Sequence, residues 1–263
     1  MVDVVSAGLR ERVRGRRRRT VAFGVGGILG WIVVWQVIAV VGHLPQVTLP
    51  TPVEVGATLV ALGREASTWN DVLVSLQEVV VGYLVGSAVG YMVGALLGVS
   101  QLWRRYVGPV VEVFRFVIPF SWIPLTVLWF GTSLTGKEVL VGYAVFFVMA
   151  VSVEEAVRSV DPALVKVGRM VGMSRYALIA QVQLRASLPR TFTGLRVAIA
   201  VAWISLIAAE YVGSSAGLGF LIVNAEQQLQ TSTILAGMVF IGVIGSVLSI
   251  AVGVIGRRVN SHG

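Results

Sequence analysis

The sequence predicts an all-α membrane protein, a bundle of six transmembrane helices with both termini in the cytoplasm. Only 13% of its 263 residues are charged and 56% are hydrophobic, whereas soluble domains are close to a quarter charged. Uncharged apolar segments recur along the chain, and about 20 such residues span a bilayer. We therefore expect a basic cytoplasmic tail at residues 1–20 and one helical membrane domain at residues 21–263.

The basic tail contains seven arginines, including the run from Arg16 to Arg19, and an apolar segment begins directly after it at Val21. A basic block beside a membrane span holds that end of the chain in the cytoplasm. This placement accounts for much of the net charge of +8 without nucleic acid, which we do not expect as a partner. The apolar segment is longer than the core of a secretory signal peptide, so we expect it to remain as an anchor.

Six apolar segments are candidates for membrane spans, of which three are long and three are shorter or interrupted by prolines. Charges that flank the shorter segments can reach the interface or face the bundle interior. With the N-terminus inside, six spans place 18 of the 21 Lys and Arg residues in the cytoplasm, as the positive-inside rule requires. The expected spans are Val21–Gly42, Val79–Val99, Phe116–Gly136, Val139–Val153, Val197–Ala209 and Thr233–Gly256.

Two segments on the predicted outer side are expected to form short helices at the membrane surface. One is Val53–Leu62, which follows a Pro-Thr-Pro sequence, and the other lies within Ser214–Thr231. Within the second span, glycine recurs at every fourth position, which aligns the glycines on one helix face. Such a stripe predicts close contact with another helix, either in the same subunit or in a second one. The glycines are at positions 82, 86, 90, 94 and 98.

The longest internal loop, at about residues 158–190, is predicted to contain two helices joined by a glycine turn. Asp161-Pro162 is typical of a helix start, because Asp caps free N–H groups and Pro fits the first turn. Apolar residues then follow at helical spacing until Gly172. A second helix is expected over Arg175–Leu188 and should end at Pro189.

The residue inventory argues against an enzyme. There is no cysteine, and the two histidines are His43 and His262, so thiolate metal sites and histidine chemistry are not expected. Residues 131–137 match the spacing of a phosphate-binding loop, but Glu138 replaces the magnesium ligand and the segment joins two spans. Residues 213–217 match a nucleophile elbow without a histidine partner. We expect no catalytic residue, metal or cofactor in this chain.

Pro119 and Pro124 should kink the third span and free backbone carbonyls, which is tolerated only beside protein or a water-filled cavity. We therefore expect polar and aromatic residues nearby to line a translocation pathway. For the aromatic residues, the alternative is a position in the core or facing lipid. For Glu210, the alternative is an anchor at the membrane interface. Glu112 and Arg115 should pair along one helix face. The pathway candidates are Ser121, Trp122, Phe146, Trp203 and Glu210.

The internal loop resembles the signature loop of binding-protein-dependent ABC permeases, in which a Glu-Ala-Ala sequence precedes a glycine and, further on, a Leu-Pro. Here Lys166-Val167-Gly168 precedes Gly172, and Leu188-Pro189 follows. Lys166 reverses the charge of the usual glutamate. Several short sequences are similar to the nitrate, sulfonate and taurine uptake branch, namely Leu49–Pro52, Trp129–Gly131, Asp161–Leu164, Gly194–Arg196, Ala202-Trp203, Ala209-Glu210 and Gly217–Gly219.

The resemblance implies a type I ABC importer permease in a prokaryotic plasma membrane. Such a subunit pairs with a second permease, most simply as a homodimer, with two cytosolic ATPases that bind ATP and Mg, and with an extracytoplasmic substrate-binding protein. Its solute would be a small anion. A membrane scaffold or sensor without flux is the alternative. The implied ATPase-coupling residues are Lys166, Val167, Gly168, Arg169, Val171, Gly172, Met173, Ser174, Arg175 and Pro189.

Overall fold

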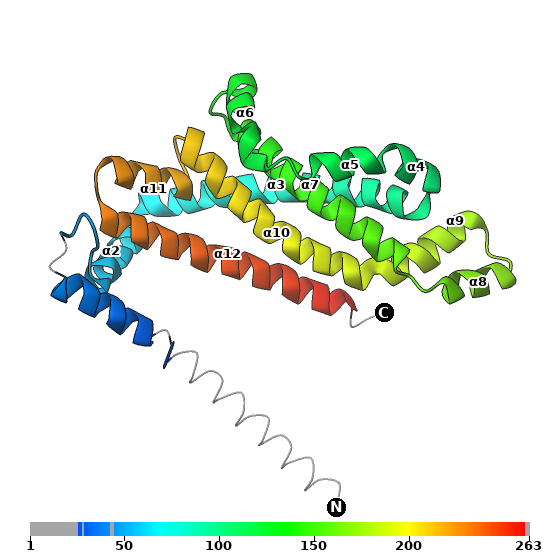
Figure 1. The fold of residues 1–263 in the computed structure, drawn as a ribbon, viewed down its shortest axis with the longest axis horizontal. Helices are drawn as coiled ribbons and strands as arrows, with labels where there is room; N and C mark the ends of the chain where they lie inside the picture. The colour runs from blue at the N-terminus through cyan, green and yellow to red at the C-terminus, as the bar shows by residue number, and fades with distance from the viewer. Residues whose placement is uncertain (1–25, 28, 43–44, 261–263) are drawn as a thin grey trace, which may run out of the picture.

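The computed structural model describes residues 26, 27, 29–42 and 45–260, and its regular elements in these ranges are all helical (Figure 1). The basic tail, the start of the expected first span, His43 and His262 lie outside the described residues. From the first span, the apolar helix Leu29–Val41 is described.

Four described helices are long and apolar enough to cross a membrane. They are α3 (Ala66–Val99), α7 (Leu134–Arg158), a continuous helical stretch over Arg175–Gly213 that ends in α10 (Arg185–Gly213), and α12 (Thr231–Asn260). A fifth crossing results if α5 (Gly108–Phe114) is counted together with the segment Pro119–Phe130. The count of six spans is therefore supported only in part. A short helix, α4 (Gln101–Tyr106), links α3 to α5.

The third expected span, Phe116–Gly136, is not one helix. The chain bends by 87° between α5 and the segment that follows it. That segment consists of a 3-10 turn, η1 (Pro119–Trp122), and α6 (Ile123–Phe130). Both have a proline in their first turn, where the missing N–H is not needed, so each proline fits a helix start. The last residues of the expected span already belong to α7.

Pro189 does not end a helix, contrary to the sequence prediction. It lies inside α10, and α10 directly follows a π-helical segment, η2 (Leu178–Leu184). Hydroxyl groups bond to nearby backbone carbonyls: Ser187 Oγ donates to Leu184 O at 2.8 Å, and Thr193 Oγ1 donates to Pro189 O at 3.3 Å. Membrane helices tolerate proline where local π segments and neighbouring helices adjust to it, and here the helix continues through Pro189.

The glycine stripe of α3 packs against α7 within the same subunit, which settles the alternative left open by the sequence. A Cβ atom at Gly82 would lie 2.7 Å from Val141 Cβ, and one at Gly90 would lie 2.7 Å from Met149 Cβ. Real Cβ atoms do not approach this closely, so the two backbones meet because these positions have no side chain. Val145 and Met149 of α7 are buried in this contact.

We expect the replacement Gly90→Ala to destabilise the fold by about 1–3 kcal/mol, because overpacking a close helix contact forces the backbones apart. Gly242→Ala in α12 is the matched control, since a Cβ at that position meets no atom within 4 Å. Thermal unfolding of the purified chain in detergent measures the difference. Equal melting temperatures for the two variants would contradict the packing role of the stripe.

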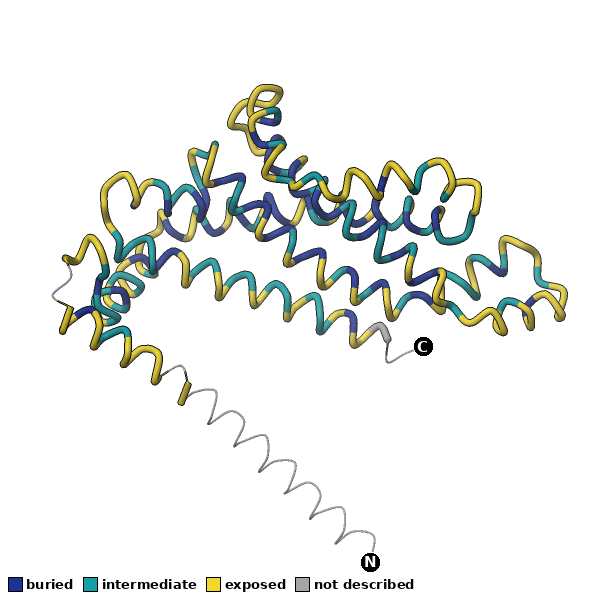
Figure 2. Tube along the Cα trace, viewed as in Figure 1, coloured by how far each residue is buried: buried dark blue, intermediate teal, exposed yellow. Residues whose placement is uncertain are grey.

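The core lies where α3, α7 and α10 meet, and Figure 2 shows the buried residues concentrated there. On its other side α10 contacts α12, where Trp203 Nε1 donates to Ile241 O at 3.1 Å and the indole lies over Gly245. Much of α12 is exposed or half-buried, as expected for a helix that faces lipid or another subunit.

The two short helices expected at the outer surface are present. α2 (Pro52–Arg64) begins with a capping box, in which Thr51 and Glu54 bond to each other's backbone N–H. α11 (Leu218–Gln227) follows Gly217. Both lie at one end of the long helices, which we call the outer end, and the internal loop projects from the other, which we call the loop end (Figure 1).

Candidate functional site

The loop end is built around the turn at Gly172. Asp161 caps α8 (Pro162–Met170) by accepting a hydrogen bond from Ala163 N at 2.8 Å. After α8, Met173 N donates to Gly168 O and Gly172 N donates to Arg169 O, both at 3.0 Å. Gly172 has φ +80°, so this is a Schellman motif with glycine at its left-handed position. The predicted helix and glycine turn are confirmed.

The loop end has two arms, α8 before the Gly172 turn and the helical segment after it, and the second arm packs directly on the first. Ser174 caps α9 (Arg175–Ala177) by accepting from Ala177 N at 3.3 Å, and η2 follows without a break. Leu178 of η2 is buried against Gly168, where a Cβ would lie 2.6 Å from Leu178 Cδ2. Because both arms share this contact, the loop end is held together as one unit.

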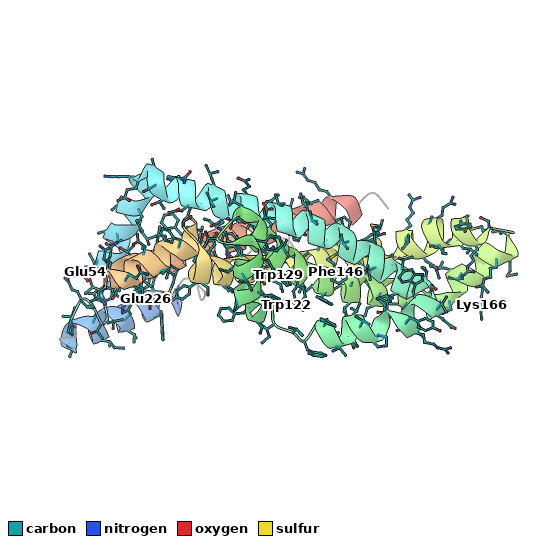
Figure 3. All side chains as sticks on the ribbon, turned by 90° about the horizontal axis from the view of Figure 1, so that it is seen from above. Glu54, Trp122, Trp129, Phe146, Lys166 and Glu226 are labelled. Carbon is teal, nitrogen blue, oxygen red and sulfur yellow. The ribbon has the colours of Figure 1, made fainter. Side chains whose placement is uncertain are left out.

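The surface of this unit combines exposed apolar and basic side chains at the tip of the molecule. Met170 and Tyr176 are 85% and 84% exposed, and Figure 3 shows Lys166 at the opposite end from Glu54 and Glu226. The structure thus brings together all the predicted coupling residues except Pro189, which lies further along in α10. The exposed Met170 and Tyr176 and the arginines beside them are of residue types that are enriched at protein interfaces. The exposed members of the predicted coupling set are Lys166, Val167, Arg169, Val171, Gly172, Ser174 and Arg175.

The break between α5 and α6 lies against the middle of α7. Tyr143 OH bonds to two carbonyl oxygens at the break, Phe114 O at 3.0 Å and Val117 O at 3.3 Å. Its ring lies 5.5 Å from Trp122. An α7 side chain thus bonds backbone carbonyls at the point where the chain breaks. A cavity of about 350 Å³ opens beside the break.

The predicted pathway residues divide into two groups. Ser121 and Trp122 lie in η1 at the break, and Phe146 lines an apolar groove between α3 and α7 and packs edge-on to Phe147. Figure 3 shows Trp122 and Phe146 at mid-length of the molecule. In contrast, Trp203 and Glu210 are buried inside the subunit, with 6% and 1% of their surface exposed.

A buried ion pair near the outer end was not predicted from the sequence. Glu78 of α3 is fully buried and its Oε1 lies 2.5 Å from Lys137 Nζ of α7. Lys137 also donates to Ser214 Oγ at 2.9 Å. In the sequence, Lys137 lies between two expected spans, and the second expected span begins directly after Glu78. The sequence did contain a signal for this pair: Glu78 and Lys137 each stand beside an apolar segment, where a charge requires a partner.

Glu210 extends this polar cluster to the turn between α10 and α11. Its carboxylate accepts from Ser75 Oγ at 2.5 Å and from Gly219 N at 2.7 Å. Gly217 has φ +112°, and a Cβ there would lie 2.5 Å from the Glu210 carboxyl carbon. Gly217 N donates to Asp71 Oδ1 at 2.9 Å. Lys137 ends the motif at residues 131–137, and Gly217 ends the motif at residues 213–217. Both residues therefore have a structural role, because their contacts hold the turn between α10 and α11.

Comparison with known proteins gives a consistent result. Residues 86–262 match the family described as "Binding-protein-dependent transport system inner membrane component". The Escherichia coli (strain K12) taurine transport system permease protein TauC is 29% identical and covers 97% of this chain and 98% of its own length. The nitrate import permease protein NrtB of Leptolyngbya laminosa is 29% identical over 75% of this chain and 71% of its own. A protein of Bacillus subtilis (strain 168) that is named SsuC, for aliphatic sulfonates transport, is 32% identical over 86% of this chain and 82% of its own.

Two solved structures share the fold. The MetNI methionine ABC transporter, in an inward-facing conformation, superposes with a TM-score of 0.63 at 22% identity over 72% of this chain and 94% of that one. A bacterial ABC transporter involved in import of the polysaccharide alginate gives a TM-score of 0.64 at 13% identity, covering 93% of this chain and 99% of that one. These identities are low, so the likeness concerns the fold alone.

Proposed function

This chain belongs to the family of inner-membrane components of binding-protein-dependent transport systems, and we propose that it couples solute passage to ATP hydrolysis by a separate ATPase. It is a permease subunit of an ABC importer. In the proposal, two cytosolic ATPases bind the loop end, an extracytoplasmic binding protein docks at the outer end, and a second copy of this chain completes the pathway.

The observation that carries this proposal is the projecting unit around Gly172. It stands at the tip of the molecule, its two arms are fixed to each other through Gly168 and Leu178, and η2 continues directly into α10. A displacement of this unit would therefore also move α10, a helix that crosses the whole bundle. Rigid-body motion of this kind is how transporters alternate access.

The charge of the loop end suggests what its partner provides. Lys166, Arg169 and Arg175 are exposed and no acidic partner contacts them among the described residues. Potentials across protein interfaces are complementary. We therefore expect carboxylates on the ATPase surface that receives this unit, opposite Lys166 above all.

The names of the relatives support a solute class, because they refer to taurine, nitrate and aliphatic sulfonates. These compounds share an anionic group on a small body, and we propose a small anion as the solute of this chain. Ser121, Trp122 and Phe146 are the proposed pathway residues. Trp203 and Glu210, buried in the subunit, are proposed to support the pathway rather than to line it.

Reconstitution tests the proposal. The purified chain in proteoliposomes is expected to hydrolyse no ATP alone, and hydrolysis should appear when the ATPase is added. With the binding protein present, ATP should drive accumulation of labelled taurine, an alkanesulfonate or nitrate. Assembly with the ATPase but no flux of any solute would favour a scaffold or sensor and contradict the proposal.

A further inference from the structure

Arg115 is a charged residue beside a cavity at membrane depth. It directly follows α5, at the point where the chain breaks before η1, and it lines the cavity of about 350 Å³ together with Pro119, Tyr143 and Ser152. The α7 residues that line the cavity run from Tyr143 to Ser152, the central part of Leu134–Arg158. An arginine at this depth is costly in hydrocarbon and points to a functional site.

The local contacts of Arg115 leave most of its donors free. Its Nε lies 2.9 Å from Glu112 Oε2, and its Cζ lies 4.9 Å over the Phe116 ring. Among the described residues, the terminal nitrogens Nη1 and Nη2 have no hydrogen-bond partner. A guanidinium has a planar fork of donors that matches the oxygens of a carboxylate, sulfonate or nitrate. The fork is thus available beside the cavity.

Glu112 does not fully occupy this cation. The Glu112 side chain is 58% exposed and lies one helical turn before Arg115, so the pair is an i,i+3 contact on an uncovered face of the chain. The pair also keeps the arginine neutralised when the cavity holds no anion. An entering anion can therefore take the open face of the guanidinium without first breaking a buried ion pair.

We propose that Arg115 binds the anionic group of the solute as it passes the broken helix. This inference rests on the proposed transport function and assigns the residue that recognises charge within the permease. Discontinuous helices near the bilayer midplane commonly form solute sites in transporters. Tyr143 supports the site by holding the carbonyls of the break, and the aromatic rings of Phe116 and Phe147 flank the cavity.

The test compares Arg115→Gln with Glu112→Gln in the reconstituted transporter, because both variants remove the same ion pair. The measurements are uptake of the anion that the wild type transports and the ATP hydrolysed over the same time. Arg115→Gln is expected to lower uptake about tenfold or more, as for loss of a hydrogen bond to a charged group, while ATP hydrolysis stimulated by the binding protein continues. Glu112→Gln should retain most of the wild-type uptake, because it keeps the guanidinium.

A charge swap separates recognition from architecture. If the ion pair only stabilises the fold, the double variant Glu112→Arg/Arg115→Glu should restore uptake, and the two single variants should show equal losses. Either result would overturn the inference, as would normal uptake by Arg115→Gln. If the wild-type transporter moves no anion at all, the proposed solute class fails first, which is a distinguishable outcome.

Discussion

Replacing Lys137 by methionine is expected to lower the free energy of unfolding by about 3–5 kcal/mol, because it leaves the carboxylate of Glu78 buried without its cation. Glu78 has no exposed surface, and Lys137 lies 2.5 Å from it, so water cannot compensate for the loss. Lys137 also donates a hydrogen bond to Ser214 Oγ, which lies in the turn between α10 and α11. Thermal unfolding of the purified variant in detergent measures the effect.

The double variant Lys137→Met/Glu78→Leu is the control for this prediction. Apolar replacement of both partners in a buried ion pair is often close to neutral, whereas removal of one partner is not. We therefore expect the double variant to regain most of the lost stability. A single variant that unfolds at the wild-type temperature would mean that Glu78 finds another partner.

Replacing Gly172 by valine is expected to abolish ATP-driven uptake while membrane insertion continues. Gly172 has φ +80°, a conformation that costs an L-residue about 1–2 kcal/mol and a β-branched one more. The Schellman motif would open, and α8 would lose its fixed position on Leu178. Uptake in proteoliposomes and the amount of protein in the membrane fraction are the two measurements.

Gly172→Asn is the matched variant, because asparagine tolerates the left-handed region. No atom lies within 4 Å of a Cβ at this position, so side-chain size alone is not the obstacle. Uptake should survive in Gly172→Asn and fail in Gly172→Val. Equal uptake by the two variants would mean that coupling does not need the left-handed turn at Gly172, which would contradict the prediction.

Local signals predicted the features that depend on local physics. The spacing of glycines in α3 predicted the close helix contact, and Asp161 and Gly172 predicted the ends of α8, because caps and left-handed turns depend on a few adjacent residues. The rule that proline ends a helix failed at Pro189. There α10 continues through the proline, directly after the π segment η2.

Features that join distant segments could not be predicted from periodicity. The Glu78–Lys137 pair joins α3 to α7, and Glu210 reaches both Ser75 and Gly219. Glu78, Lys137 and Glu210 each stand next to a predicted span end, where a charge is ordinary at an interface. Only the longer course of α3, which begins at Ala66, places Glu78 inside the bundle.

The central claim is that the Gly172 unit faces the cytosol and docks on an ATPase. The chain has no cysteine, so single cysteines report position directly. Met170→Cys, at the exposed loop end, is expected to react with a membrane-impermeant thiol reagent only from the cytosolic side, and bound ATPase should block the reaction. Leu229→Cys, at a 68% exposed position of the outer end, should react only from outside. Labelling of Met170→Cys in intact cells from the outside would contradict the account.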